Sequence, residues 1–330
     1  MSQIQLPEAK SWGGALLVSD LGVLQAQGAD AATFLHGQLS QDTKGQAATE
    51  GRLAAYCSAK GRMLASMVTL RPEPETFWLL TDRQVLPGLL KRLQMFVLRA
   101  KAVLSDASAT LNVVGLVGEV AQGWLGEAAG SEPWQARAHA GGQVLRLPDV
   151  QGVARWVWVG PASEAATVTG ALPALPEAAW RWLDVMSGVP RIEATTVDQF
   201  VPQMVNFELI GGVNFKKGCY PGQEVVARSQ YRGTTKRRAF VVHAAQALQP
   251  GQEVFSAADP AQPAGLVINT APMPTASPSA GLPVDGGPSS ALIELKLAAV
   301  GSALFAGSAD GVALTLGSLP YDLPSAESAD

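Results

Sequence analysis

Apolar positions near the start of the chain change from strand-like runs to a helical period. GALLVSD (residues 14–20) and GVLQAQG (residues 22–28) are strand candidates that flank Asp20-Leu21-Gly22, which predicts a β-hairpin. Asp30 then occupies the N-cap position of a segment whose apolar side chains follow helical spacing: Ala31, Phe34, Leu35 and Leu39. This pattern predicts two strands followed by a helix.

More strands and a second helix are predicted further along. RLAAYCSA (residues 52–59) and RMLASMVTL (residues 62–70) flank a Lys60-Gly61 turn, and TFWLLTD (residues 76–82) follows them. Asp82 is the expected cap of a helix with Leu86, Leu89, Leu90, Leu93 and Val97 on one face. This order of elements predicts an α+β sandwich.

A weak internal repeat suggests a second unit of the same kind. VLQAQGADAATFLHG, from Val23, resembles VVGLVGEVAQGWLGE, from Val113, at a constant offset of 113 − 23 = 90 residues. Both copies have the pattern of a strand, a glycine turn and a helix, which indicates two related α+β units. Chance similarity between two amphipathic segments explains the match equally well.

Beyond residue 236 only short strands are predicted. RRAFVVHA, QEVFSA, AGLVINT, ALIELKLAA and GVALTL are separated by Gly/Pro turns, which is typical of a small β-barrel. Residues 271–290 are rich in Pro, Ser and Gly and are expected to form a mobile loop, and LPSAESAD is expected to be a frayed tail. The expected domains are residues 1–105, 106–190, 191–235 and 236–330.

Composition narrows the class of protein. The chain has 330 residues, 47% of them apolar, and a net charge of −4, which argues against a surface that binds nucleic acid throughout. The segment MSQIQLPEAKSWGG has neither a basic nor an apolar signal region, and the most apolar stretch is interrupted by Glu294 and Lys296. We therefore expect a cytoplasmic protein with no membrane partner.

Cysteine and histidine usage argues against disulfides and metal sites. The two cysteines, Cys57 and Cys219, form no CxxC pair, which favours a reduced compartment. The three histidines are widely spaced, so no metal site is expected, and local sequence marks none of them as a base for a cysteine nucleophile.

VNFKKGCYPGQEVVARSQYRGTTKRR, residues 213–238, surrounds Cys219 with features that favour a thiolate. Pro221 fits the first turn of a helix, which places Cys219 just outside a positive helix N-terminus and behind Lys216 and Lys217. Gly218 and Gly222 would let a ligand approach the backbone closely. The alternative is a small buried cysteine of the core, and the local cues support the two equally.

The same segment concentrates positive charge. Residues 216–238 carry seven Lys and Arg against Glu224 alone, a balance of 7 − 1 = +6 in a chain of net charge −4. Such a patch would attract an anionic ligand, or it is a solvated helix face followed by a basic linker. Only Tyr220 and Tyr231 interleave with these charges, so direct nucleic-acid binding is not expected.

FVPQMVNFELIGGVNFKKGCYPGQEVVAR, residues 200–228, resembles the signature of the folate-binding YgfZ family, relatives of the glycine-cleavage aminomethyltransferase (T-protein). The family's K-G-C-Y/F-x-G-Q-E run is intact from Lys217 to Glu224. Further matches are GADAATFLHGQLSQD, the Lys60-Gly61-Arg62 turn, FVLRAKA and WLDVMSGVPRI. The resemblance covers residues from about 15 to 245.

The resemblance implies a fold and a function. Two related α+β units and a C-terminal β-barrel would form a three-domain ring, with residues 191–235 packing back on a central cavity. The cavity would hold tetrahydrofolate or a one-carbon derivative. The family is associated with the assembly or repair of iron–sulfur clusters, and through tRNA methylthiotransferases with tRNA modification and oxidative-stress tolerance. The expected partners are thus folate and iron–sulfur client proteins, and an accessory role is favoured over an enzymatic one.

Site residues follow from the same resemblance. Lys217 and Cys219 would be the functional pair, in a motif shaped by Tyr220, Gly222, Gln223 and Glu224. Glu208 would accept hydrogen bonds from the pterin, or be a solvated loop carboxylate. Arg191 or Arg62 would meet the glutamate tail, or form structural salt bridges. Trp180 and Trp182 are expected in the core.

Aminomethyl or other one-carbon transfer to tetrahydrofolate is the alternative function. The T-protein uses an acidic residue near the strand turn that reads AKGRML here. This chain has no Asp or Glu between Gly51 and Pro72, which leaves the transferase hypothesis second.

Overall fold

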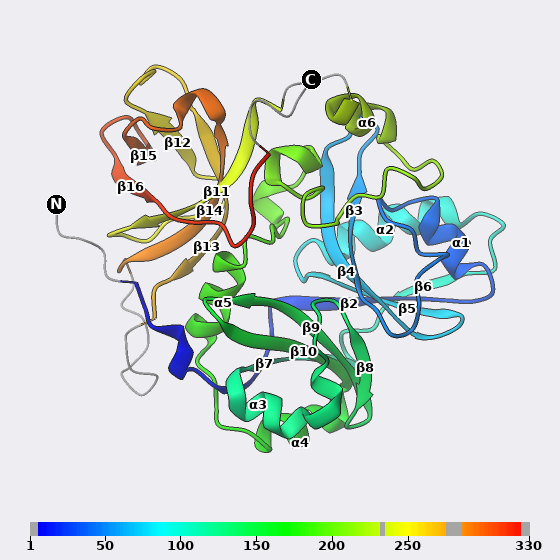
Figure 1. Cartoon of the computed structure of the whole chain (residues 1–330). Helices are drawn as coiled ribbons and strands as arrows, with labels where there is room; N and C mark the ends of the chain where they lie inside the picture. Colours follow the sequence, from blue (N-terminus) through cyan, green and yellow to red (C-terminus); the bar gives the residue numbers. More distant parts are fainter. Residues whose placement is uncertain (1–5, 232–234, 275–285, 325–330) are drawn as a thin grey trace.

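A computed structural model describes residues 6–231, 235–274 and 286–324 (Figure 1).

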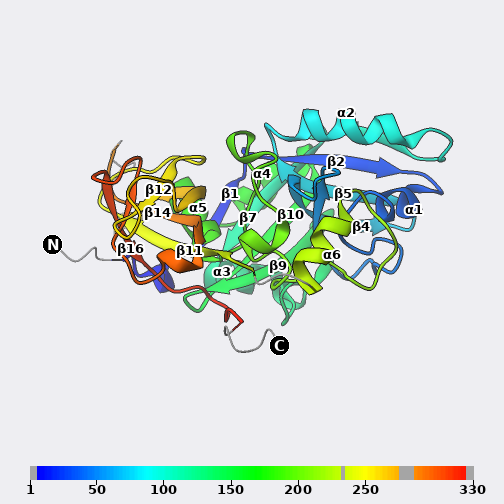
Figure 2. The same ribbon diagram turned by 90° about the horizontal axis from the view of Figure 1, so that it is seen from above.

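The first α+β unit is an antiparallel sheet covered by two helices. The strand order is β3-β4-β5-β2-β6, and Figure 2 shows α2 along the outside of the sheet. The elements are β2 (Leu21–Gln27), α1 (Ala31–His36), β3 (Arg52–Cys57), β4 (Met63–Glu73), β5 (Thr76–Asp82), α2 (Leu86–Val97) and β6 (Val103–Asp106).

Both predicted helices form, although their predicted caps act differently. The Asp30 side chain accepts a hydrogen bond from the backbone N–H of Lys101, 2.7 Å away, instead of capping α1. Asp82 accepts from the backbone N–H groups of Gln84 and Val85, one turn before α2 begins. Leu35 of α1 and Leu89 and Leu93 of α2 are buried against the sheet, as the helical spacing predicted.

The second unit repeats this architecture. Its sheet has the order β1-β7-β10-β9-β8, with α3 and α4 packed on one face. The elements are β1 (Gly14–Leu17), β7 (Leu111–Val117), α3 (Gly118–Leu125), β8 (Ala136–His139), β9 (Gly142–Val150), β10 (Val153–Pro161) and α4 (Ala162–Gly170).

The predicted hairpin over residues 14–28 is wrong. β1 pairs antiparallel with β7 in the second sheet, whereas β2 pairs with β5 and β6 in the first. Both edges of β2 are therefore taken by other strands. An alternating pattern specifies a strand and its buried face, but it does not specify the partner.

The internal repeat is a real feature of the architecture. β2 and β7 coincide at the offset of 90 residues, since 21 + 90 = 111 and 27 + 90 = 117. Gly28 and Gly118 both follow their strands with positive φ, 132° and 80°. A side chain would collide with the Lys101 carbonyl at Gly28 and with the Trp12 carbonyl at Gly118. β1 thus occupies the edge of the second sheet that β6 occupies in the first.

The C-terminal strands close into a barrel, as predicted. The order around it is β11-β14-β13-β12-β15-β16. The strands are β11 (Arg237–Ala244), β12 (Glu253–Ser256), β13 (Gly265–Pro272), β14 (Ser289–Lys296), β15 (Leu304–Ala306) and β16 (Val312–Leu316), and β15 was too short to be predicted. Most of the loop predicted at 271–290 and of the predicted tail lies outside the described residues. The predicted domain boundaries remain predictions.

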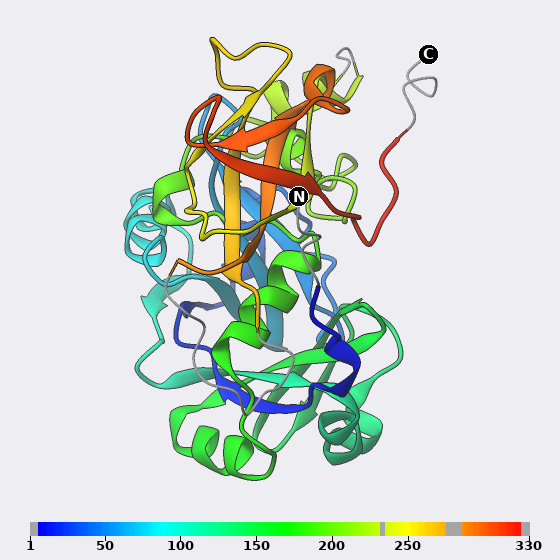
Figure 3. The ribbon, with the colours of Figure 1, turned by 90° about the vertical axis from the view of Figure 1, so that its left-hand side faces the viewer.

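Helix α5 (Glu177–Met186) joins the three units, and Figure 3 shows it between the barrel and the second unit. The Trp182 indole donates a hydrogen bond to the Ser290 hydroxyl on β14, at 2.9 Å, and His243 of β11 lies 2.9 Å from the same hydroxyl. Trp182 is fully buried, so its expected place in the core is confirmed. Within residues 6–231, 235–274 and 286–324, no helix has the length and apolar run needed to span a bilayer.

The remaining helices are short. α6 covers Gln223–Tyr231. Single 3₁₀ turns are formed by Ala9–Ser11, Gly126–Ala129, Ala194–Thr196, Pro202–Val205 and Leu297–Ala299.

Candidate functional site

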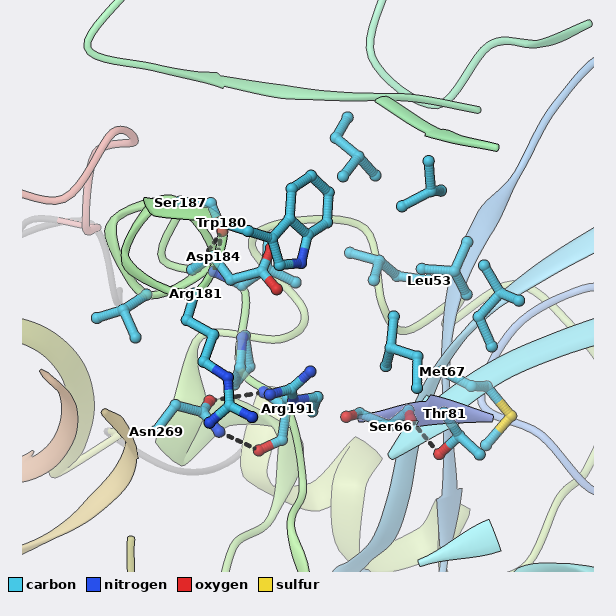
Figure 4. A pocket seen from close by; sticks show the side chains of 18 of the residues that line it. Leu53, Ser66, Met67, Thr81, Trp180, Arg181, Asp184, Ser187, Arg191 and Asn269 are labelled. Carbon is cyan, nitrogen blue, oxygen red and sulfur yellow. Dashed lines mark hydrogen bonds between the residues drawn. The ribbon is translucent and has the colours of Figure 1, made fainter. Parts of the chain in front are cut away.

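A pocket opens where the two sheets, α5 and the barrel meet. We call it the central pocket; Figure 4 shows Leu53 and Met67 on its first-sheet side, Trp180 and Asp184 on α5, and Asn269 of β13. It encloses about 880 Å³, counting the part open to solvent. Both sheets contribute apolar side chains to its wall: Leu21, Leu53, Met67, Leu80, Leu147 and Val157.

Three arginines supply the positive charge of the central pocket. Arg155 pairs with Asp184 at 2.7 Å, and Arg191 pairs with Asp20 at 2.8 Å. Burial alone would lower the pKa of Arg191, but nearby carboxylates, Asp20 foremost, raise it above its usual value. Arg181 lies 3.5 Å from Asp20 and is partly exposed. The pocket therefore keeps permanent cations beside an apolar wall.

The barrel holds the backbone at Arg191 in place. The Asn269 side chain accepts from the Arg191 N–H at 2.8 Å and donates to the Arg191 carbonyl at 2.7 Å. The same amide donates to Glu193, 2.7 Å away. Burial raises the pKa of Glu193, while Arg191 and the Asn269 hydrogen bond act in the opposite direction. A carboxylate with this tendency can accept or hold a proton close to a ligand.

Two buried donors of the central pocket have no partner in the described part of the chain. They are the indole N–H of Trp180 and the Nε–H of Arg181. Buried polar groups are nearly always hydrogen-bonded, so these two donors lack a partner that such groups usually have. The expectation that Trp180 is a core residue is therefore incomplete: it is buried, and it also lines the pocket.

Of the predicted binding residues, Arg191 alone lines the central pocket. Of the described residues in segment 191–235, Arg191 and Glu193 contribute to its wall, and the motif from Lys217 to Glu224 does not. The expectation that segment 191–235 packs back on a folate cavity stays a prediction, and the motif does not line this pocket. The motif instead lies beside α1 and the β3–β4 turn, because Gly218 faces His36 and Gly222 contacts Ser58 and Gly61.

Lys217 ties the motif to the end of α1. Its ammonium group donates to the backbone carbonyls of His36 and Leu39 and lies 4.7 Å above the Tyr220 ring. Burial lowers the pKa of Lys217 to about 8, against smaller opposite effects of Asp42 and Cys219. Lys217 is thus a half-buried anchor of the motif.

Cys219 is exposed, so the alternative of a buried core cysteine is wrong for it. Cys57 is instead the buried core cysteine, and burial raises its pKa to about 12. The fold also supplies a histidine that local sequence did not mark. Asp42 Oδ1 accepts a hydrogen bond from His36 Nδ1, 2.9 Å away, and His36 Nε2 lies 3.4 Å from where a Gly218 Cβ would stand.

Gly222 serves the packing of two turns. α6 begins at Gln223, so Pro221 lies in the turn ahead of the helix and not in its first turn. Gly222 has φ 78°, and a Cβ there would collide with the Ser58 carbonyl and lie 2.7 Å from the Gly61 Cα. The space expected for a ligand beside Gly222 is therefore filled by the β3–β4 turn.

The other motif residues have mixed environments. Tyr220 is buried, its hydroxyl has no partner in the described residues, and burial raises its pKa. Gln223 is partly exposed at the start of α6. Glu224 is exposed and pairs with Arg228 at 2.8 Å, as a helix-surface pair does.

Glu208 and Arg62 lie outside the lining of the central pocket. Glu208 is buried and paired with Arg238, and burial raises its pKa, so it is not a solvated carboxylate. One of its oxygens has no partner among the described residues. Arg62 donates to the backbone carbonyls of Gln199 and Asp198.

Three of the six described cationic side chains in the basic segment are paired with carboxylates. Arg228, Arg237 and Arg238 pair with Glu224, Glu294 and Glu208. Lys217 is engaged by carbonyl oxygens. Arg232 lies outside the described residues. Glu294 and Glu208 balance two of the six excess positive charges, which leaves 6 − 2 = +4, and Lys216 and Lys236 are exposed.

Comparison with known proteins decides the family. The tRNA-modifying protein YgfZ of Edwardsiella ictaluri is 34% identical over 66% of this chain and 67% of its own length. That of Photorhabdus laumondii is 33% identical over 72% of this chain and 73% of its own length. The chain belongs to the YgfZ family. No family model matches the chain.

The fold is that of the aminomethyltransferases. The crystal structure of the glycine cleavage system aminomethyltransferase T from Bartonella henselae superimposes with a TM-score of 0.69 over 94% of this chain and 87% of that chain. The sequences are 16% identical, so this similarity establishes the fold alone. The predicted T-protein-like arrangement is confirmed.

Sequence reasoning missed much of what lies around the YgfZ motif and in the central pocket. Asp42 and His36 fall within a segment that was chosen for its family resemblance and not for its chemistry. The pocket residues Arg155, Arg181 and Asn269 come from separate elements, and no local signal unites them. No group of three or more metal-ligating side chains occurs within residues 6–231, 235–274 and 286–324.

Proposed function

We propose that this YgfZ-family protein binds tetrahydrofolate, or a one-carbon derivative of it, in the central pocket. The observation that carries the proposal is the pairing of an apolar wall with two unpartnered buried donors, on Trp180 and Arg181. Folate combines a flat ring that carries acceptors and donors with an anionic glutamate tail. Those features match the chemistry of the pocket.

The residues present fit the folate molecule. Trp180 and Arg181 would donate to its acceptor atoms, and Asp184 and Glu193 would accept from the amino groups of the pterin. Arg191, held in place by Asn269, would attract the carboxylates of the tail. The folate supplies one-carbon chemistry when bound, and the protein orients it and shields it from water.

We further propose that the protein is a cytoplasmic accessory factor for iron–sulfur proteins, such as the tRNA methylthiotransferases, and thereby supports tRNA modification. The names of its relatives, tRNA-modifying proteins, support this role. The exposure of Cys219 suits a thiol that meets a partner protein. With two cysteines in the chain, any cluster held here would share ligands with that partner.

Complementation tests the role of the motif. In a strain that lacks the protein, the wild-type chain is expected to restore tRNA methylthiolation, and Cys219→Ala is expected to restore less than about a third of it. Cys57→Ala is the matched control, since Cys57 is buried in β3 and is expected to restore the wild-type level. Full restoration by Cys219→Ala would remove Cys219 from the proposed function.

Aminomethyl transfer remains the second candidate because of one structural observation. Asp198 brings a carboxylate to the β3–β4 turn, where it accepts a hydrogen bond from the Ser58 hydroxyl at 2.9 Å. The acid missing from the local sequence is therefore supplied by a distant segment. Folate-dependent release of ammonia from an aminomethyl-lipoyl donor, abolished by Asp198→Asn, would support a transferase. The accessory role predicts no ammonia.

A further inference from the structure

The outward side of α2 carries apolar side chains that the described fold leaves exposed. Leu89 and Leu93 of this helix are buried against the first sheet. Met95 and Phe96, in its last turn, are 58% and 50% exposed, and Figure 2 shows α2 along the outside of the molecule. Solvent-facing positions of a surface helix are normally polar, so these two side chains form an uncovered apolar spot.

The turn after α2 adds a third exposed apolar side chain. Leu98 is 86% exposed, more than any other large apolar side chain in the described ranges. Its φ of 45° and ψ of −103° lie in a region that residues other than glycine avoid. Such strain is kept where the surrounding structure or the function requires it, and a side chain so exposed makes little packing that could require it. FVLRAKA, the family match that spans this turn, does not line the central pocket.

Positive charge surrounds these apolar side chains. Residues 83–105 contain five Lys and Arg and no Asp or Glu, so the remainder of the chain carries −4 − 5 = −9. Lys91 and Arg92 are exposed, and each lies four residues before one of the exposed apolar side chains of α2, which makes them neighbours on the helix surface. Arg99 and Lys101 are exposed in the turn that follows.

These cations form no ion pair among the described residues. Asp30 lies at the same turn, where it accepts a hydrogen bond from the backbone N–H of Lys101. The surface therefore combines an apolar spot with positive charge that the fold does not use. Its complement is an apolar spot with negative charge.

We propose that this surface, the α2 patch, docks a partner protein that presents an apolar spot bordered by Asp and Glu. The patch consists of Lys91, Arg92, Met95, Phe96, Leu98 and Arg99. Protein interfaces have an apolar centre and a polar rim, and Phe, Met and Arg are enriched in them. RNA would account for the cations and for stacking on Phe96, but it would leave Met95 and Leu98 without a role. The inference rests on the proposed accessory role and gives it the surface that holds the client protein.

Complementation tests the α2 patch in cells. In the strain that lacks the protein, Phe96→Ser and Arg92→Glu/Arg99→Glu are each expected to restore less than about a third of the wild-type tRNA methylthiolation. The first removes the apolar anchor and the second reverses the charge of the rim. The control variants, at exposed positions outside the patch, are Val120→Ser and Lys10→Glu/Arg137→Glu. Both controls should restore the wild-type level.

Purified proteins identify the class of partner. The probe is the tRNA methylthiotransferase of the same organism, and biolayer interferometry should show about tenfold weaker binding by the two patch variants than by the wild type and the controls. The association rate of the wild type should fall as NaCl rises from about 50 to about 300 mM, since salt screens the rim charges. Patch-dependent binding of transfer RNA, or of phosphatidylcholine vesicles with about 30% phosphatidylglycerol, without patch-dependent binding of the enzyme would overturn the assignment to an acidic protein.

Leu98→Gly separates docking from stability. Glycine adopts a φ of 45° without strain, so this variant should unfold at a urea concentration equal to or higher than that of the wild type. It also removes the most exposed apolar side chain of the patch, so it should bind the enzyme roughly fivefold more weakly. A leucine kept for the fold would give the opposite result, a lower urea midpoint with unchanged docking.

Failure of the patch and failure of the proposed function give different results. Tetrahydrofolate should bind all patch variants as it binds the wild type, because no residue of the α2 patch lines the central pocket. Wild-type levels of methylthiolation in both patch variants, or absence of enzyme binding by the wild type, would overturn the inference alone. Failure of the wild type to restore methylthiolation would contradict the accessory role, and the inference with it.

Discussion

At the scale of single residues, the burial and the hydrogen-bond or ion-pair partners of each predicted site residue distinguish roles that the sequence left open. The motif predicted Lys217 and Cys219 as a functional pair, but their environments differ. Lys217 is half-buried and donates to backbone carbonyl oxygens, whereas Cys219 is exposed. Arg191 was predicted as a binding residue, and the fold places it in the central pocket. Glu208 and Arg62 were predicted on equal grounds, and they are bound to other parts of the chain.

Lys217 should titrate at an unusually low pH. Burial lowers its pKa from 10.5 to about 8, so between pH 8 and 10.5 the unfolded chain binds the proton more tightly than the folded one. Stability relative to Lys217→Met should therefore rise with pH across this window. The difference in urea midpoints at pH 7.5 and 9.5 measures it, and NMR of ¹³C-methylated lysines reports the midpoint. A titration of Lys217 near 10.5 would contradict the burial argument.

At the scale of elements, the motif is held by contacts between turns. The turn before α6 rests on the β3–β4 turn through Gly222 and Gly61, and residues 198–200 join the same place by hydrogen bonds to Met63. These contacts link the motif to the first sheet. The K-G-C-Y-x-G-Q-E run is thus partly a packing requirement.

Comparing alanine substitutions at Gly222 and Gly211 should separate the cost of backbone strain from the cost of a steric collision. In Gly222→Ala the new methyl group would collide with the Ser58 carbonyl, and the backbone φ of 78° at this position would be strained. The substitution is expected to lower the free energy of unfolding by about 3 kcal/mol. Gly211 has a similar φ of 82° with nothing within 4 Å, so Gly211→Ala should cost about 1 kcal/mol from backbone strain alone. Urea denaturation compares them. Equal losses would show that the turns do not pack as described.

The buried pair of Glu208 and Arg238 joins the segment before the motif to barrel strand β11. Arg238→Met would leave a buried carboxylate unpaired and is expected to cost about 3–5 kcal/mol at pH 7.5. Burial already raises the pKa of Glu208, so the loss should shrink as the pH falls and Glu208 takes up a proton. The double change Arg238→Met/Glu208→Leu should recover most of the stability. A loss that stays constant from pH 7.5 to 5 would count against an ionised Glu208.

At the scale of the whole molecule, local patterns predicted elements better than they predicted partners. Strand and helix periodicity located most elements, and the repeat predicted two related units. The placement of β1 in the second sheet could not be predicted, because the short apolar segment GALL fits the edge of either sheet and does not specify its partner strand. The central pocket was equally invisible, since its wall combines both sheets, α5 and β13.

Binding of tetrahydrofolate to the central pocket is the central claim, and anaerobic calorimetric titration tests it most directly. The wild type and Cys219→Ala should bind saturably with equal affinity, because Cys219 does not line the pocket. Trp180→Phe keeps an aromatic ring and removes one unpaired donor, so it should bind about tenfold more weakly, while Trp124→Phe, outside the pocket, should bind like the wild type. Absence of binding to the wild type, or equal affinity in Trp180→Phe, would contradict the account.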